Sequence, residues 1–275
     1  MNLKKILWAF FYTFLVLDIV LIYQWVVVNR PLTDPGSSQS VKKEMQMDGI
    51  KYHHMDSKPL SGAYLSADED NALYGQRYRI SGAFSATKSG NTLVATPKKP
   101  VNLGHTRAQA IAKLKKMMLD KNAVIDGSEY QYDRFMTDYL NEKQNASGDG
   151  FQAVFSQRAR PDVTGKVFST ARARIQFTVD ENYNLKNYTQ THVNHVEKLR
   201  DISSLISEED ALINAYQYNE IPNNSVVQSS QLNYMIFKMV RGDVIYVPVW
   251  SFVIKNNANE VSTISINAMN GALMH

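Results

Sequence analysis

The sequence predicts an α+β protein in which a single N-terminal transmembrane helix precedes an extracytoplasmic region of two similar helix-plus-antiparallel-sheet units. Three observations support this prediction: a long apolar run near the N-terminus, two capped helices that each precede a group of strands, and strands whose apolar and polar residues alternate. Short turns separate the strands, which is typical of antiparallel sheets.

The apolar run covers residues 6–28 and is about 23 residues long. A helix rises about 1.5 Å per residue, so this length crosses a hydrocarbon core of about 30 Å with some tilt. Lys4 and Lys5 precede the run, and a basic flank stays on the cytoplasmic side. We therefore expect residues 1–5 to form a cytoplasmic tail and the bulk of the chain to lie outside the cell membrane after a single pass.

A cleaved signal peptide is the alternative to an anchor. Its apolar region is shorter, about 7–15 residues, and small residues follow it at the cleavage site. Here the run ends in Val27-Val28-Asn29-Arg30, which favours an uncleaved anchor.

Three polar residues interrupt the apolar run: Thr13, Asp18 and Gln24. Asp18 falls near the middle of the span, where an aspartate costs about 2.5–3.5 kcal/mol on insertion scales. We therefore expect Asp18 to contact a polar group on another spanning helix, with Thr13 and Gln24 as lesser contacts. The alternative is that Asp18 is merely tolerated, because the remaining residues are apolar enough to insert.

Composition narrows the possible functions. The chain has 275 residues, 44% of them hydrophobic, and no cysteine, which excludes thiol catalysis and cysteine-ligated metals. The formal net charge of +4 is a weak bias, and about half of it flanks the apolar run. Such a weak positive charge does not predict binding to nucleic acid.

Residues 29–48 are polar and contain Pro31 and Pro35, so they are expected to form a stalk. The first extracytoplasmic unit, with an N-terminal extension, is expected at 49–200 and the second at 201–275.

Each unit contains one helix with a clear start. Thr106 and Gln109 form a capping-box candidate that opens a helix of about 13 residues, ending near Asp120. Ser207 precedes three acidic residues, which suit the positive end of a helix dipole, about 101 residues after Thr106. Strands follow both helices, and this shared order predicts an internal duplication.

Strands are predicted from alternation and from turn residues. Those of the first unit are 130–140, 151–160, 171–180 and 185–196, and those of the second are 226–240, 244–254 and 261–268. The strand 244–254 is apolar on both faces, so both faces should be covered. Trp250 and Phe252 share one face and are candidates for the core or for an interface. Pro248 cannot donate to the ladder, which predicts a bulge or an edge position.

No side-chain pattern predicts catalysis, a cofactor or a metal. The sequence contains no G-x-S-x-G, P-loop or H-E-x-x-H motif. His192 and His195 are three residues apart in a segment that reads as a strand, where such positions point to opposite faces. An enzyme without a readable motif stays an alternative.

Four segments together resemble the YycH/YycI family, and YycI within it. They are MDGIKYHHMDSKPLSGAYLS, SEEDALINAYQ, YVPVWSFVI and ISINAMNGAL. The last two also resemble the PepSY-type arrangement, in which a strand with a Pro-x-Trp pattern precedes a strand that ends in a small-residue turn. The resemblance covers essentially the whole chain.

The resemblance implies a regulator without catalytic residues. Such a protein, with a YycH-like partner, modulates a WalK/YycG-type sensor histidine kinase that controls cell-wall metabolism through the response regulator WalR in Gram-positive bacteria. Contacts through the spanning helices and the exterior domains are implied, although such helices often carry Asn where this chain has Asp18. The alternative is a PepSY-like exported module that binds or inhibits a protease or a wall component.

Overall fold

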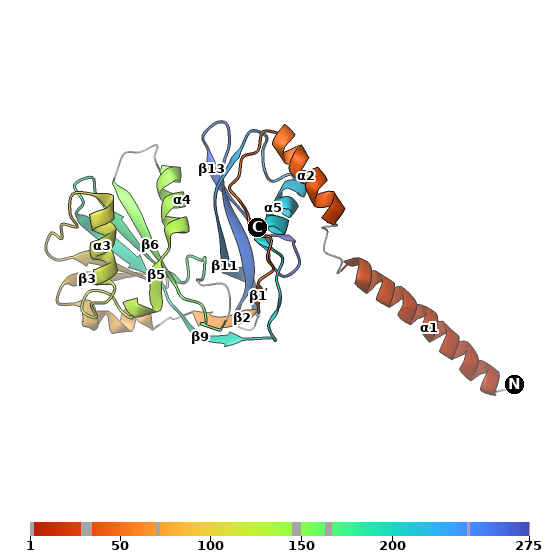
Figure 1. Ribbon diagram of the computed structural model, residues 1–275. Coiled ribbons are helices and arrows are strands. Elements are labelled where there is room, and N and C mark those ends of the chain that lie inside the picture. The colour runs from red at the N-terminus through yellow and green to blue at the C-terminus, as the bar shows by residue number, and fades with distance from the viewer. Residues whose placement is uncertain are drawn as a thin grey trace.

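The computed structural model describes residues 3–28, 35–69, 72–144, 150–162, 167–240 and 243–274. They form two six-stranded sheets and one two-stranded ladder, with helices on the sheets (Figure 1). Every pairing between named strands in these ranges is antiparallel. The predicted α+β class with antiparallel sheets is therefore confirmed.

The first sheet has the strand order β3-β4-β8-β7-β6-β5. Its strands are β3 (Phe84–Ser89), β4 (Thr92–Pro97), β5 (Tyr130–Tyr132), β6 (Phe151–Gln157), β7 (Arg174–Val179) and β8 (Leu185–Gln190). Helix α3 (Arg107–Met117) buries Ala110 and Leu114 against one face of this sheet, together with Phe155 and Phe177. Two short 3-10 helices, Leu73–Ile80 and Gly127–Glu129, lie beside it.

The second sheet has the order β14-β13-β12-β2-β9, and β11 pairs with the other edge of β12. Its strands are β2 (Leu65–Glu69), β9 (Val193–Lys198), β11 (Val226–Val240), β12 (Asp243–Lys255), β13 (Val261–Asn267) and β14 (Leu273–Met274). Helix α5 (Glu208–Gln217) covers one face of it, and the short strands β1 (Ser61–Gly62) and β10 (Ser203–Ser204) pair nearby.

A separate apolar cluster packs the connection between β6 and β7 of the first sheet against the second sheet. Phe168, from the segment between β6 and β7, is fully buried against Tyr234 of β11 and Tyr246 of β12. The Phe168 and Tyr246 ring centroids are 4.7 Å apart. Because aromatic side chains bury large areas, this cluster ties that connection to the second sheet.

Both predicted helix starts are confirmed by their caps. The Oγ1 atom of Thr106 accepts a hydrogen bond from the Gln109 N–H at 3.2 Å, and the Gln109 Oε1 atom accepts one from the His105 N–H at 2.9 Å. The Oγ atom of Ser207 accepts from the Asp210 N–H at 3.0 Å. Each cap satisfies backbone donors that the first helical turn leaves unpaired.

The predicted strand 130–140 is wrong beyond its first three residues. After β5 the chain turns into helix α4 (Arg134–Gln144), and the Asp133 Oδ1 atom accepts from the Met136 N–H at 3.0 Å. Asp133 is thus an N-cap, and Phe135 and Tyr139, four residues apart, lie on one side of the helix. The helical spacing outweighed the aromatic content that favoured a strand.

The predicted strand 185–196 is two strands in different sheets. Strand β8 ends at Gln190 in the first sheet, and β9 begins at Val193 in the second. Thr191 and His192 carry the chain across. Alternation is similar in both strands, so it gives no sign of the change of sheet.

Pro248 lies inside the sheet rather than at an edge or a bulge, which corrects the prediction. It is paired with Tyr234 of β11, whose own N–H donates to the Val167 oxygen on the far side at 2.9 Å. The two residues therefore form a non-hydrogen-bonded pair, and the Pro248 nitrogen faces the opposite edge of β12. There β2 pairs only up to Tyr246 and β13 begins at Val249, so no ladder donor is needed.

Part of the expected stalk is folded. Residues Pro35–Met47 form helix α2, and Val41 and Met45 are buried in the cluster that α5 makes with the second sheet. Residues 29–34 lie outside the described ranges. The domain boundaries at 48 and 200 stay predictions, and β2 and β9, which precede residue 201, belong to the second sheet.

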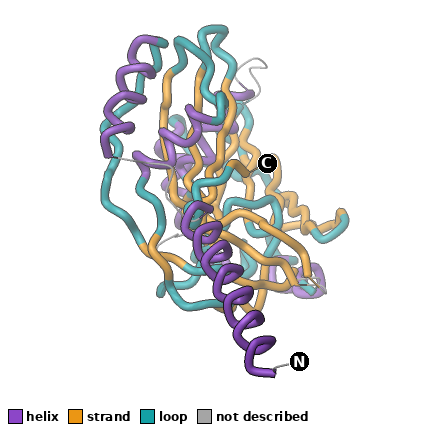
Figure 2. Tube along the Cα trace, turned by 90° about the vertical axis from the view of Figure 1, so that its right-hand side faces the viewer, coloured by secondary structure: helices purple, strands orange, loops and turns teal. Residues whose placement is uncertain are grey.

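Helix α1 (Leu3–Val28) is one continuous helix of 26 residues, drawn apart from the sheets in Figure 1 and in front of them in Figure 2. Between Trp8 and Gln24 the described side chains are exposed and mostly apolar. Among the residues that the structure describes, no helix combines the length and hydropathy needed to span a membrane.

Candidate functional site: the cleft between α4 and β11

Helix α4 is fixed to the first sheet by polar side chains one helical turn apart. The Thr137 Oγ1 atom accepts from the Val154 N–H at 2.9 Å. The Asn141 side chain accepts from the Gln152 N–H at 2.9 Å and donates to the Gln152 oxygen at 2.7 Å. Strand β5 reaches only the end of β6. Side chains of α4 therefore take the place of a strand along the rest of this edge.

Asp133, at the start of the same helix, is a buried acid. Its Oδ2 atom accepts from the Ser156 hydroxyl at 2.7 Å. Burial raises the pKa of Asp133, while the hydrogen bonds from Met136 and Ser156 and the charge of Arg174 oppose the rise. Burial in turn lowers the pKa of Arg174. The Asp133 carboxyl, which caps α4, therefore has a pKa that depends on how well the helix packs on the sheet.

Replacing Asp133 with asparagine should alter the pH dependence of stability. The folded protein holds this proton to a higher pH than the unfolded chain, whose carboxyl titrates near 3.8. The wild type should therefore lose stability as the pH rises from about 4 through the folded pKa, and Asp133→Asn, which still caps a helix, should lack that loss. Urea unfolding of both proteins between about pH 4 and pH 7 tests this; parallel stability curves would contradict it.

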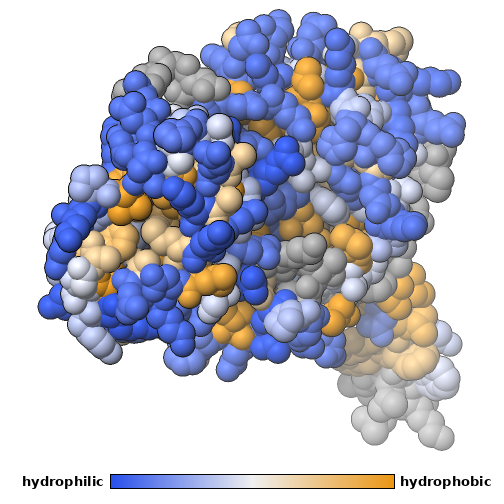
Figure 3. All heavy atoms as spheres, turned by 60° about the vertical axis from the view of Figure 1, so that its left-hand side comes forward, coloured by the Kyte–Doolittle hydropathy of each residue, from blue (hydrophilic) through white to orange (hydrophobic). Residues whose placement is uncertain are grey.

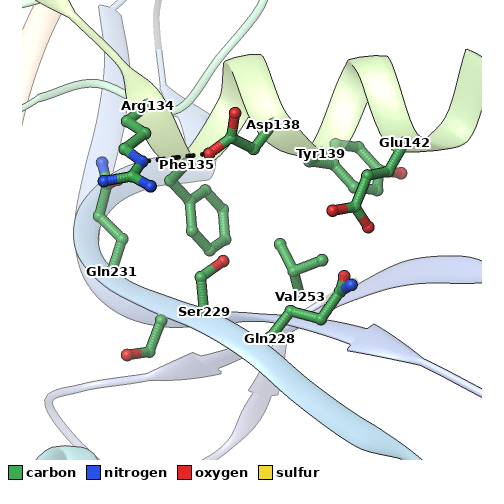
Figure 4. A pocket seen from close by; sticks show the side chains of 10 residues that line it. Arg134, Phe135, Asp138, Tyr139, Glu142, Gln228, Ser229, Gln231 and Val253 are labelled. Atoms are coloured by element: carbon green, nitrogen blue, oxygen red, sulfur yellow. Dashed lines mark hydrogen bonds and ion pairs between the residues drawn. The ribbon is translucent and has the colours of Figure 1, made fainter.

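The opposite side of α4 forms one wall of a cleft of about 410 Å³ whose other wall is β11 (Figure 4). Side chains from two turns of α4 and from the first third of β11 face one another across it, with one residue of β12. The lining residues are Arg134, Phe135, Asp138, Tyr139, Glu142, Gln228, Ser229, Ser230, Gln231 and Val253. Phe135 and Val253 are buried, so the middle of the cleft is apolar and its ends are polar.

The charges in the cleft are unevenly paired. Asp138 forms two ion pairs: its Oδ1 atom lies 3.0 Å from Arg107 Nη2, and its Oδ2 atom lies 3.3 Å from Arg134 Nε. Glu142 has no ion pair among the described residues, and its Oε2 atom is shielded from solvent without a hydrogen-bond partner there. In Figure 4 the Glu142 carboxylate points into the cleft towards Gln228. A positively charged or hydrogen-donating group would satisfy it.

A β-bulge shapes the floor of the cleft. The register between β11 and β12 shifts between Val227 and Ser229, which leaves Gln228 as the extra residue. Bulges turn side chains away from the regular alternation and recur beside functional sites. Here the bulge brings the Gln228 amide opposite Glu142 (Figure 4).

His192 and His195, whose spacing was considered for a metal site, each pair with a different acidic residue. The Nε2 atom of His192 lies 2.7 Å from Glu129 Oε2, and the Nδ1 atom of His195 lies 3.2 Å from Asp68 Oδ2. In the ranges that the structure covers, no three His, Asp or Glu side chains are grouped so that they could hold a metal.

The polar residues predicted for α1 do not share one face. At about 100° per residue, Thr13 and Gln24 fall within about 20° of each other around the helix axis, whereas Asp18 is about 140° from Thr13. A helix that contacts Asp18 would therefore approach a different side of α1 from one that contacts the other two. Their role as contacts stays a prediction.

Trp250 and Phe252 lie in the cluster between the second sheet and α5. Phe252 is fully buried and Trp250 is 8% exposed, with its Nε1–H donating to the Ile206 oxygen at 3.0 Å. Most exposed large apolar side chains lie on α1, and the face in Figure 3 is largely hydrophilic, with apolar groups at its left and lower right. Neither candidate residue is available as a large exposed contact.

The sequence did not predict the cleft, because α4 was taken for a strand. The signal was present in Asp133 as a cap and in the spacing of Phe135, Tyr139 and Glu142, which follow at intervals of three and four residues. The bulge at Gln228 has no sequence signal that we can identify.

Comparisons with known proteins identify the relationship of the chain. A family model described as YycI protein matches residues 33–269. No curated protein matches the chain. Among solved structures, the chain is similar to an uncharacterized protein from Eubacterium rectale ATCC 33656, with 9% sequence identity, a TM-score of 0.49, and coverage of 83% of this chain and 91% of that chain.

Proposed function

This chain belongs to the YycI family, and from that premise we propose that it is a non-enzymatic, membrane-anchored regulator that acts with a YycH-like partner on a sensor histidine kinase of the WalK/YycG type. The family is a membrane-associated family of regulators of the YycG/WalK system. The match over residues 33–269 carries the proposal, because it covers the first sheet, the second sheet except β14, and the caps at Thr106 and Ser207.

The anchor is part of the same proposal and rests on the sequence of residues 6–28, since no helix among the described residues meets the length and hydropathy of a membrane span. Helix α1 has 26 residues, which corresponds to about 39 Å, and its described side chains are mostly apolar and exposed. The sequence of residues 6–28 supports a single pass with the N-terminus inside. The sheets would then lie outside the membrane, where the cell-wall machinery controlled by such a kinase operates.

Co-purification tests the proposal directly. Full-length tagged protein, extracted in mild detergent, should bring down a sensor histidine kinase and a second single-pass protein. Recovery of a protease or a wall hydrolase in place of the kinase would overturn the proposal and favour a PepSY-like inhibitory module.

Replacing Asp18 with leucine should weaken that assembly. Polar contacts between spanning helices contribute about 0.6–2 kcal/mol, so association should fall roughly 3–30-fold while the exterior stays folded. Val20→Leu, on the same helix, is the matched control and should associate like the wild type. If Asp18→Leu associates and signals like Val20→Leu, Asp18 makes no important contact with a partner, and the extracytoplasmic region must mediate the interaction.

A further inference from the structure

Strand β11 has an open outer edge between two short contacts. Along its length it pairs with β12. On the other side Lys51 bridges to Val226 and Phe168 bridges to Tyr234, both in the parallel sense. Between these bridges, no strand among the described residues pairs with residues 228–232.

The backbone hydrogen bonds show which groups face this opening. The Val227 N–H donates to the Lys51 oxygen at 2.8 Å, and the Tyr234 N–H donates to the Val167 oxygen at 2.9 Å. Outward and inward groups alternate along a strand, so Ser230 and Leu232 also direct their N–H and C=O groups outward. Four backbone groups therefore face the opening without a strand partner in the described part of the chain.

The opening coincides with the cleft. Residues Ser229, Ser230 and Gln231 belong both to this part of β11 and to the cleft lining, and α4 lies over them (Figure 4). The volume of about 410 Å³ falls in the usual range for binding pockets. Helix α4 contacts β11 and β13, so it keeps a broad sheet from approaching this part of β11.

We propose that this cleft binds an extended peptide segment of a partner protein, which adds to β11 as a short parallel strand and places a basic side chain against Glu142. The parallel direction follows from the bridges at Lys51 and Phe168, because the segment would fill the interval between them. Five residues of β11 at about 3.3 Å each set a length of about 16 Å. Backbone pairing supplies affinity and the side chain supplies selectivity, as in other strand additions.

The basic side chain is inferred from charge. Asp138 already has two arginine partners, whereas Glu142 has none among the described residues and keeps one oxygen unpartnered. A lysine or arginine that enters the cleft would form an ion pair with the partly buried Glu142 carboxylate. The inference is independent of the proposed function, because peptide binding is measured without the kinase.

Fluorescent pentapeptides with blocked ends test the inference. Each peptide alternates Thr and Val and carries one lysine, placed in turn at every position, and a matched set carries norleucine there. Fluorescence anisotropy with the full chain in mild detergent should find binding for at least one lysine position, about tenfold tighter than its norleucine counterpart. Methylating the peptide backbone nitrogens that face β11 should abolish binding.

The variant Glu142→Gln keeps the shape of the side chain and removes its charge. It should lower affinity for the lysine peptide to the level of the norleucine peptide. Glu181→Gln, the same change on an exposed turn, is the control and should bind normally. Hydrogen exchange should slow at 228–232 in the complex. The proposal is overturned if no peptide binds, if Glu142→Gln binds lysine peptides like the wild type, or if protection appears only elsewhere.

Discussion

Replacing Trp250 with alanine is expected to lower the free energy of unfolding by about 3–5 kcal/mol. Trp250 is 8% exposed and packs between β12 and α5 in the apolar cluster of the second sheet. On the neighbouring strands it pairs with Leu232 and Ile266. Removing the ring leaves a cavity that rigid strands cannot close, and it leaves the Ile206 oxygen without its donor.

Urea unfolding of the full chain, monitored by circular dichroism, measures this loss of stability. Trp250→Phe is the control: it keeps most of the apolar volume and removes the Nε1–H, so its smaller loss separates packing from the hydrogen bond. If Trp250→Ala unfolds like the wild type but no longer co-purifies with partners, Trp250 belongs to an interface rather than to the core.

Replacing Asn141 with leucine is expected to cost about 2–4 kcal/mol. Asn141 is buried, and its side chain satisfies both the N–H and the C=O of Gln152 on β6. Leucine has a similar volume but makes neither hydrogen bond, so two partly buried backbone groups lose their partners, at about 1–3 kcal/mol each for fully buried groups. Protection against hydrogen exchange should fall most where α4 and β6 meet, so the Gln152 amide should exchange faster than in the wild type.

Lys143→Gln is the matched control for this prediction, because Lys143 is exposed on the same helix. A surface change of this kind is expected to stay within about 0.5 kcal/mol of the wild type. Equal stability of Asn141→Leu and Lys143→Gln would mean that water satisfies the edge of β6 as well as α4 does.

Strands that follow one another with short connections were predicted most closely, and the reason is physical. Strands β11, β12 and β13 follow one another with short connections, so pairing partners are neighbours in the sequence. The caps at Thr106 and Ser207 are equally local, since a side chain bonds a backbone group three residues away. Signals of this range are visible in a single sequence.

Features that depend on distant partners were not visible. Pro248 is tolerated inside β12 because β2, some 180 residues earlier, ends its pairing at Tyr246. The division between β8 and β9 depends on which sheet each meets. The cleft was missed for a similar reason, because it needs α4 and β11 side by side. Asp18 was singled out from its depth in the apolar run, and its contact with another spanning helix stays a prediction.

The placement of β2 in the second sheet sets the order in which the protein can be completed. Leu65 pairs with Tyr246, so β2 can join β12 only after nearly the whole chain has been synthesised. During that interval β2 and β9 form at most a two-stranded ribbon, which is marginal on its own and leaves open edges for wrong pairing. The first sheet uses only residues up to Gln190 and can form earlier. We therefore expect a ribosome stall before residue 243 to leave the edges of β2 and β9 exposed, which makes assembly of this protein sensitive to chaperones that hold unfolded chains.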